Sequence, residues 1–420
     1  MHAHYFIIFV TFFTCFQQIK SVIRPVLINQ FNIPHVTAVT LVRSWVLNST
    51  SMTLMITTND VVPTSTDYIY TVPSIQWYIT TNITAQLVTN QIYWPNTVVP
   101  ADPIVPYSII VPSGYFVPSK TNGNIYFIGS DNKPIALAPT EKTNWFYHDV
   151  AFKDVDMDGY TDIVTGRANV PLVHDPQTEL VWLKNPGQMN ITGPWNVSIL
   201  MPEGGSEMNL QFADLQGRSF LFANSFFTRK LQLIWSLDEP RWNDASKIRL
   251  RHISNNPLQY YFLRYTTDLN GDQIPDLLAT VSNGFNGLLL AYELPPAGEM
   301  INGTFKEHIL AGGFKPTDPA IGRISPGKPT PYQFYSLTDR KKPIILLSGA
   351  DDGCVYLLEA VHDNDPTDWQ YYMTTVYNST GMSIGDICID DVDNDGHPEL
   401  FIPATNEGKV LIYRLMNDGN

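Results

Sequence analysis

The stretch KDVDMDGYTDIVTG, Lys153 to Gly166, places four aspartates within nine positions and then becomes apolar. Carboxylates this close repel one another in a folded loop, so two interpretations are open: a solvated acidic turn, or a loop that binds a cation. The two interpretations differ in what the rest of the chain should contain. A solvated turn has no reason to recur in register, whereas a cation-binding loop that belongs to a structural repeat should recur.

Two related loops follow further along the chain. They begin at Asp268 and Asp391, and like the first loop, which begins at Asp154, they carry acidic or amide side chains at positions 1, 3, 5 and 9. Such oxygens at alternate positions suit Ca²⁺, a hard cation that takes about six to eight oxygen ligands, and a glycine at position 6 allows the turn that brings them inward. The predicted calcium ligands are Asp154, Asp156, Asp158 and Asp162 in loop one, Asp268, Asn270, Asp272 and Asp276 in loop two, and Asp391, Asp393, Asp395 and Glu399 in loop three.

The sequences around these loops distinguish them from an EF-hand. An EF-hand needs a bidentate glutamate at position 12 and flanking helices, but position 12 here is Thr165, Ala279 or Ile402, in short apolar runs that predict strands. Each loop should therefore connect two strands. Loop two has Asn270 in place of an acid and Gln273 in place of the glycine, so we expect it to bind calcium more weakly.

A second repeated feature is an apolar strand such as GKVLIY, Gly408 to Tyr413. Between successive copies the sequence predicts a strand that enters the loop, a strand that leaves it, this marker strand and one further strand. Four strands in a unit of about 50 residues are typical of a propeller blade, whose packing buries both faces of the sheet. The equivalent positions of the seven copies, 50 to 66 residues apart, are Ile75, Ile125, Leu180, Leu231, Leu289, Val355 and Val410.

The sequence therefore predicts an all-β fold, a seven-bladed β-propeller of four-stranded blades that forms a single domain over residues 22–420. The units around Asp214 and Ser336 keep the strands but lack the acidic loop. The chain ends soon after the seventh marker strand, which would leave an unpaired edge. We expect the segment near Val22 to Gln30 to supply the missing outer strand and close the ring.

The acidic loop with its following apolar strand resembles the FG-GAP, or VCBS, repeat of calcium-binding β-propellers, which include the heads of integrin alpha subunits. The resemblance covers about Asn122 to Tyr413. It implies that the side chains of the three loops, together with a backbone carbonyl, are calcium ligands. The chain departs from the pattern because the FG and GAP tripeptides are missing and Glu399 replaces the ninth aspartate.

Composition and the N-terminus indicate the compartment. The 420-residue chain has a net charge of -14 and no run of Lys and Arg, which argues against a nucleic-acid partner. The apolar run from Tyr5 to Phe16 is too short to span a bilayer and predicts a signal peptide over residues 1–21, and no later segment predicts a membrane span. Six sequons agree with a secreted glycoprotein: Asn48, Asn82, Asn190, Asn196, Asn302 and Asn378.

Three cysteines are present, and Cys15 would leave with the signal peptide. Cys354 and Cys388 could form a disulfide in an oxidising compartment. Each lies in an apolar run, however, where buried free thiols are common, so the sequence favours free thiols.

Two hypotheses about function remain open. The chain has no GXSXG, HEXXH, P-loop or dinucleotide-binding motif, so the first is an extracellular recognition module that presents blade-connecting loops to a protein or a glycan. The second is a carbohydrate-active enzyme, a polysaccharide lyase or sugar dehydratase, because such enzymes also resemble this repeat. Its site would lie in the central channel, with His148, Asp149, Arg264 and Asp386 as the catalytic residues.

Overall fold

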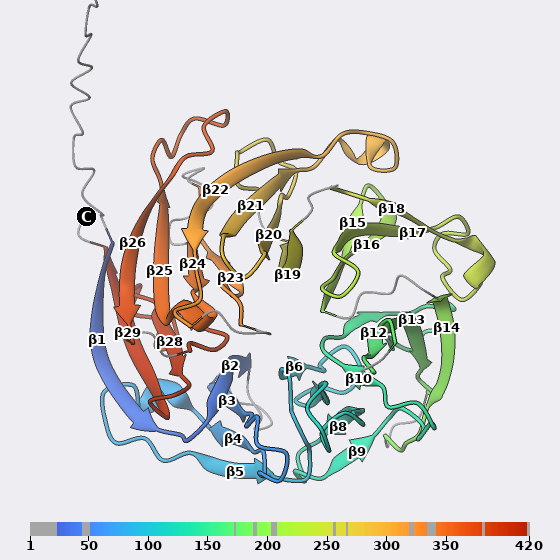
Figure 1. Cartoon of the computed structure of the whole chain (residues 1–420), viewed down its shortest axis with the longest axis horizontal. Coiled ribbons are helices and arrows are strands. Elements are labelled where there is room, and N and C mark those ends of the chain that lie inside the picture. Colours follow the sequence, from blue (N-terminus) through green and yellow to red (C-terminus); the bar gives the residue numbers. More distant parts are fainter. Residues whose placement is uncertain are drawn as a thin grey trace, which may run out of the picture.

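The computed structural model describes residues 23–43, 51–171, 174–187, 191–202, 208–254, 258–265, 268–318, 323–333, 342–379 and 383–417. Seven antiparallel sheets stand around a central axis like the blades of a propeller (Figure 1). The predicted seven-bladed fold is confirmed. In the described residues the helical elements are short 3₁₀ turns: η1 (Ile75–Trp77), η2 (Ala245–Lys247), η3 (Ala297–Glu299) and η5 (Ala350–Asp352).

Each of the first six blades follows the chain from its innermost to its outermost strand. Blades one and two contain β2 (Val36–Arg43), β3 (Met52–Thr58), β4 (Ile69–Val72) and β5 (Gln86–Thr89), then β6 (Val99–Pro100), β7 (Ile109–Pro112), β8 (Ile125–Ile128) and β9 (Pro134–Ala136). In blade three the innermost strand has two segments: β10 (Phe146–Tyr147) and β11 (Ala151–Lys153), followed by β12 (Asp162–Asn169), β13 (Gln177–Lys184) and β14 (Asn196–Pro202).

The remaining blades repeat this order. Blades four and five contain β15 (Asn209–Leu215), β16 (Arg218–Ser225), β17 (Lys230–Ser236) and β18 (Ile248–His252), then β19 (Gln259–Tyr265), β20 (Leu277–Ser282), β21 (Gly287–Glu293) and β22 (Lys306–Phe314). Blades six and seven contain β23 (Pro329–Tyr332), β24 (Ile344–Ser348), β25 (Cys354–Ala360) and β26 (Tyr371–Asn378), then β27 (Cys388–Asp390), β28 (Glu399–Ala404), β29 (Lys409–Asn417) and β1 (Ile23–Asn32).

Strand β1 closes the ring, as predicted. It lies along the outer side of β29 (Figure 1) and pairs with it antiparallel, from Ile23 opposite Asn417 to Asn32 opposite Lys409. The seventh blade thus joins the two ends of the described chain. This pairing covers the edge that β29 would otherwise expose.

The apolar strands are buried on both faces because neighbouring blades pack against each other. In β13, Leu180 and Trp182 contact blade four, where Ile234 belongs to the same core cluster. The alternate residues Val181 and Leu183 face blade two, where they join Phe127. A strand between two blades therefore has no solvated face, which explains its nearly continuous apolar sequence.

Six of the seven marker positions lie on the third strand of a blade, and one was assigned wrongly. The run SIQWYI forms η1 instead, and the third strand of blade one is β4, with the sequence IYTV. Ser74 has a φ of 53°, a left-handed conformation incompatible with a continuing strand, and Trp77 is 72% exposed. Apolar composition alone could not separate this turn from a strand.

Two further expectations concern membrane spans and cysteines. In the part of the chain that the structure describes, no helix has the length and apolar character needed to cross a membrane. The predicted signal peptide, residues 1–21, lies outside the described residues. Cys354 and Cys388 are both free thiols, as the sequence favoured.

Candidate metal loops and axial cavities

The three acidic loops occupy the same place in alternate blades. Loop one connects β11 to β12 in blade three, loop two connects β19 to β20 in blade five, and loop three connects β27 to β28 in blade seven. Each therefore joins the innermost strand of a blade to the second strand. Because this connection is the same in every blade, the three loops lie on one face of the propeller.

All three loops have the same unusual backbone, with a left-handed residue at position 4 and another at position 6. The φ values are 62° and 90° for Met157 and Gly159, 87° and 71° for Gly271 and Gln273, and 58° and 87° for Asn394 and Gly396. The glycine expected at position 6 meets this requirement in loops one and three. Loop two has the same backbone although Gln273, not a glycine, occupies that position.

The loops also share one hydrogen-bond pattern. In loop one, the Asp154 carboxylate accepts from the backbone N–H groups of Asp158 (3.1 Å) and Gly159 (2.9 Å), and Asp162 accepts from Val155 N–H (3.0 Å). In loops two and three, the acids at positions 1 and 9 accept from the same backbone positions. Three different sequences therefore fold into one loop structure.

The acid at position 9 is completely buried in every loop. Asp162, Asp276 and Glu399 each have 0% exposure. Burial is the main cause of their raised pKa values, which are about 6 for Asp162, about 8 for Asp276 and about 7 for Glu399. Burial thus disfavours the ionised form of all three carboxyls, most strongly that of Asp276, and a nearby positive charge would favour it.

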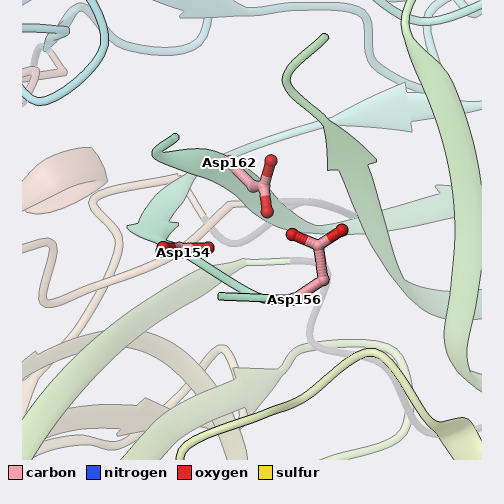
Figure 2. A group of neighbouring side chains, drawn as sticks. All are labelled: Asp154, Asp156 and Asp162. Atoms are coloured by element: carbon pink, nitrogen blue, oxygen red, sulfur yellow. The ribbon is translucent and has the colours of Figure 1, made fainter. Parts of the chain in front are cut away.

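Two groups of acids converge closely enough to hold a metal ion. Oxygen atoms of Asp154, Asp156 and Asp162 lie within 4.8 Å of one another, and Figure 2 shows the three carboxylates gathered around a shared space. The corresponding group in loop three is Asp391, Asp393 and Glu399. Asp158 and Asp395, at position 5, belong to neither group. The ligand set consists of oxygen atoms, which suits a hard cation.

Two buried carboxylate oxygens of the loops have no hydrogen-bond partner among the described residues. They are Oδ1 of Asp156 in loop one and Oδ1 of Asp276 in loop two, and both are buried. In loop two the third position is an amide, and Asn270 Nδ2 lies 3.3 Å from Asp272 Oδ2. A buried, unpaired carboxylate oxygen is costly, and a bound cation would satisfy it.

The chain itself supplies a basic side chain to two of the loops. Lys184, at the end of β13, contacts Asp156 and lies 2.8 Å from Asp158 Oδ2. Arg414 of β29 lies opposite Glu399 in the strand register and donates from Nε to Glu399 Oε1 (2.7 Å), and it also pairs with Asp393 (2.6 Å) and Asp395 (2.8 Å). Neither residue was among the predicted site residues.

Loop two has an acid where loops one and three have the base. Counted from the marker positions Leu180, Leu289 and Val410, the residue four places on is Lys184, Glu293 or Arg414. Glu293 adds to the negative field that raises the pKa of Asp276. Glu293 itself pairs with residues of the outermost strand, 2.7 Å from Lys306 Nζ and 3.3 Å from His308 Nε2.

The central channel contains two cavities at opposite ends. The larger, about 470 Å³, is lined by loops on the face opposite the acidic loops, and His148 and Asp386 are among its residues. The smaller, about 440 Å³, opens toward the acidic-loop face and is lined by Arg264 and again by Asp386. Lys328, which was not predicted, also lines the smaller cavity, 3.5 Å from Asp386 Oδ2.

The four predicted catalytic residues do not line one cavity together. His148 shares a cavity with Asp386, whereas Arg264 shares the other cavity with Asp386. Asp149 lines neither, and its Oδ2 accepts a hydrogen bond from Asn209 Nδ2 (3.2 Å). Burial lowers the pKa of His148, although Asp149 and Asp386 oppose that shift.

Comparisons with known proteins were made for both sequence and structure. No protein-family model matches the sequence, and no curated protein matches it. Among the solved structures that match, two share 10% sequence identity each with this chain. A crystal structure of glucose dehydrogenase matches with a TM-score of 0.39, over 76% of this chain and 94% of that one. A Mycobacterium tuberculosis puromycin-hydrolyzing peptidase matches with a TM-score of 0.49, over 90% of this chain and 53% of that one, so this chain spans about half of the peptidase.

Proposed function

We propose that the protein is a secreted, calcium-binding β-propeller that recognises an extracellular protein or glycan. The observation that carries the calcium proposal is the threefold repetition of one loop structure, with the same left-handed positions, the same hydrogen bonds and the same buried acid at position 9. The resemblance of the loop sequences to the FG-GAP or VCBS repeat supports calcium as the metal.

The residues that would hold calcium are among those that the sequence predicted, with Asp158 and Asp395 outside the two converging groups. In loops one and three the acids at positions 1, 3 and 9 converge, and in loop two Asp268, Asn270 and Asp276 occupy the corresponding positions, with Asp272 at position 5. When bound, calcium supplies the positive charge that the buried acid at position 9 needs. Each site would then hold together the hairpin between the two innermost strands of its blade.

Secretion is supported by the N-terminal apolar run and by the sequons. The four sequon asparagines within the described residues all have exposed side chains: Asn82, Asn196, Asn302 and Asn378. Asn48 and Asn190 lie outside the described residues. Exposed asparagines are accessible to glycosylation, as a secreted protein with this sequence requires.

A recognition role is supported by the larger axial cavity, where the acids have basic neighbours. Asp351 Oδ1 pairs with Arg323 Nη1 at 2.7 Å, and Asp386 Oδ2 lies 3.5 Å from Lys328 Nζ. A catalytic base needs a carboxylate or imidazole that is available to take a proton from the substrate. The alternative, a polysaccharide lyase or sugar dehydratase, is supported by the presence of His148 and Asp386 in this one cavity.

The calcium proposal is tested by calorimetry and by melting of the full chain in millimolar calcium and in excess chelator. At a hundredfold excess over the dissociation constant, each site should add about 2.7 kcal/mol to the free energy of unfolding. Asp156→Ala and Asp393→Ala should each remove the part of the calcium stabilisation that comes from one site. Ionic strength must be fixed, because salt alone screens carboxylate repulsion. Equal melting in both conditions with no calcium uptake would refute the proposal.

The choice between recognition and catalysis is tested with Asp149→Asn and Asp386→Asn. Both substitutions keep the side-chain size and remove one charge. The recognition proposal predicts no turnover of acidic polysaccharides or keto-sugars by the wild-type protein. Turnover that either substitution abolishes would replace it with the enzyme alternative.

A further inference from the structure

The larger axial cavity has an aromatic wall contributed by blades one and two. Trp94 and Tyr115 stack with their ring centroids 5.0 Å apart and an interplanar angle of 8°. The ring centroids of Tyr115 and Phe116 are 4.0 Å apart. All three side chains line the cavity. Phe116 is the exposed member of this row, at 38%. The wall therefore presents aromatic surface at the mouth of the channel.

A buried ion pair fixes this aromatic wall in place. Lys120 and Asp67 both have fully buried side chains, and Lys120 Nζ lies 2.8 Å and 2.9 Å from the two oxygens of Asp67. Asp67 also accepts from Trp94 N–H (2.8 Å), and Tyr115 N–H donates to the carbonyl of Lys120 (2.9 Å). Breaking such a pair is costly, so the two loops that carry Trp94 and Tyr115 are held in one arrangement.

The backbone of the cavity wall is strained on both sides. Trp94 has a φ of 49°, and Ala350, across the cavity, has a φ of 51°. Non-glycine residues rarely adopt this conformation, and it costs about 1 to 3 kcal/mol per residue. Strain of this kind persists where surrounding contacts impose a particular geometry, which is common at ligand sites.

The opposite wall is polar, and its charges are mutually compensated. Arg323 donates to Asp351 (2.7 Å) and to Ser383 Oγ (3.0 Å), and Asp351 also accepts from Ile324 N–H (2.8 Å). Asp386 has Lys328 as its basic neighbour at 3.5 Å. An ionic ligand would have to compete with these internal pairs. A neutral ligand with several hydroxyl groups could use the remaining lone pairs and N–H groups without that competition.

From these two walls we infer that the larger axial cavity binds a neutral pyranose sugar, as a free glycoside or as the terminal residue of a glycan. A pyranose ring has an apolar C–H face, which packs on an aromatic ring, and hydroxyl edges, which bind guanidinium and carboxylate groups. Phe116 would contact the C–H face, and Arg323, Asp351 and Ser383 would bind the hydroxyls. The cavity volume of about 470 Å³ is in the range typical of small-ligand sites. This inference rests on the proposed recognition role and names its ligand class.

The test uses the full chain and neutral methyl glycosides of glucose, galactose, mannose and N-acetylglucosamine. Saturation-transfer NMR should detect binding of at least one of them through its ring C–H protons. Phe116→Ala should weaken that binding by about three- to tenfold. The matched control is Phe285→Ala, which removes a phenyl ring that is 68% exposed and lines neither cavity. This control should bind like the wild type.

Three outcomes would overturn the inference. They are the absence of saturation transfer to every neutral glycoside, equal binding by wild type and Phe116→Ala, and binding of the charged probes choline or methyl glucuronide without binding of the neutral ones. Calcium uptake is measured on the same sample. If calcium binds but no neutral glycoside does, the ligand class is wrong and the calcium proposal stands. If calcium fails as well, the proposed function itself is wrong.

Discussion

Besides Asn270 and Gln273 within the loop, loop two differs from loops one and three in one side chain on the third strand of the blade. In loops one and three that residue is basic, Lys184 or Arg414, and it contacts the loop carboxylates. In loop two the equivalent residue is Glu293. The left-handed positions and the hydrogen bonds to the acids at positions 1 and 9 are the same in all three loops. The residue on the third strand therefore determines whether the chain supplies a basic partner to its own acidic loop.

This comparison changes what is expected of calcium. In loops one and three an incoming cation must compete with an ammonium or guanidinium group that already pairs with its ligands. In loop two no basic side chain contacts the described loop carboxylates, and Asp276 has an unpaired buried oxygen. The weaker binding expected from Asn270 and Gln273 is thus opposed by Glu293.

The largest effect is expected from Arg414→Met. Arg414 compensates Glu399, which is completely buried, together with Asp393 and Asp395. Removal of one partner from a buried ion pair costs about 3 to 5 kcal/mol, so the variant should lose about that much stability in chelator. Millimolar calcium should restore a large part of it, as measured by urea unfolding in both conditions.

The control for this prediction is Arg249→Met. Arg249 is exposed and donates to the carbonyls of Ser246 and Ile248, so its removal should change stability by less than about 0.5 kcal/mol. If Arg414→Met lost equal stability with and without calcium, the arginine and the ion would not share a site.

The next effect is a pH dependence of calcium-stripped protein that originates in loop two. The pKa of Asp276 is raised by burial from 3.8 to about 8, so the folded state holds the proton more tightly than the unfolded state. This group therefore favours folding least at high pH, and its contribution to stability falls as pH rises from about 4 to about 8. Calcium, which binds the ionised form, should oppose this fall.

The measurement compares stripped wild type with Asp276→Asn between pH 4 and pH 9. The asparagine cannot ionise, so the variant should become relatively more stable as pH rises. If the difference in the free energy of unfolding between the two proteins were constant across this range, ionisation of Asp276 would not destabilise the folded state.

A smaller effect is expected when the charges of two loops are exchanged. Lys184→Glu gives loop one the acid of loop two, and Glu293→Lys gives loop two a base. The first should tighten calcium binding and the second should weaken it, each by about tenfold, because one charge is reversed at a partly exposed position. Calorimetry on the two single variants and on the double variant resolves the sites. If calcium affinity changed in the same direction in both variants, the charge of this residue would not explain the contrast between loops one and two.

The sequence predicted the fold well because the fold depends on repetition. Seven apolar strands at regular spacing, three of them after acidic loops, indicated seven blades, and the missing outer strand indicated closure by the N-terminal segment. The one wrong marker, near Ile75, came from a turn whose composition matches that of a strand. The two groups of converging acids consist of residues that the sequence predicted as calcium ligands, because the acids recur at fixed positions of the repeated loop.

The positions of the basic residues Lys184 and Arg414 could have been predicted from the sequence, but the lining of the larger axial cavity could not. Lys184 and Arg414 stand four places after equivalent marker residues, so strand register could have placed them opposite position 9. The aromatic wall brings together residues from two blades. Arg323, on the opposite wall of the same cavity, comes from a loop more than 200 positions further along the chain. No repeat relates these residues, since they lie in connections that differ from blade to blade.

The smallest effect concerns the backbone that the three loops share. Gln273 adopts a φ of 71° where the other loops have glycine. A left-handed conformation costs a non-glycine residue about 1 to 2 kcal/mol, and a new glycine costs about 0.4 to 1 kcal/mol through the entropy of the unfolded chain. Gln273→Gly should therefore stabilise the protein by about 0.5 to 1 kcal/mol.

The reverse exchange in loop one, Gly159→Gln, should destabilise it by a similar amount, because Gly159 has a φ of 90° and no neighbouring atom would obstruct a side chain there. Both are measured by urea unfolding in calcium at fixed ionic strength. A loss of stability in Gln273→Gly would mean that contacts of Gln273 stabilise loop two by more than its left-handed conformation costs, and loop two would then differ from loops one and three in the packing at position 6 as well as in charge.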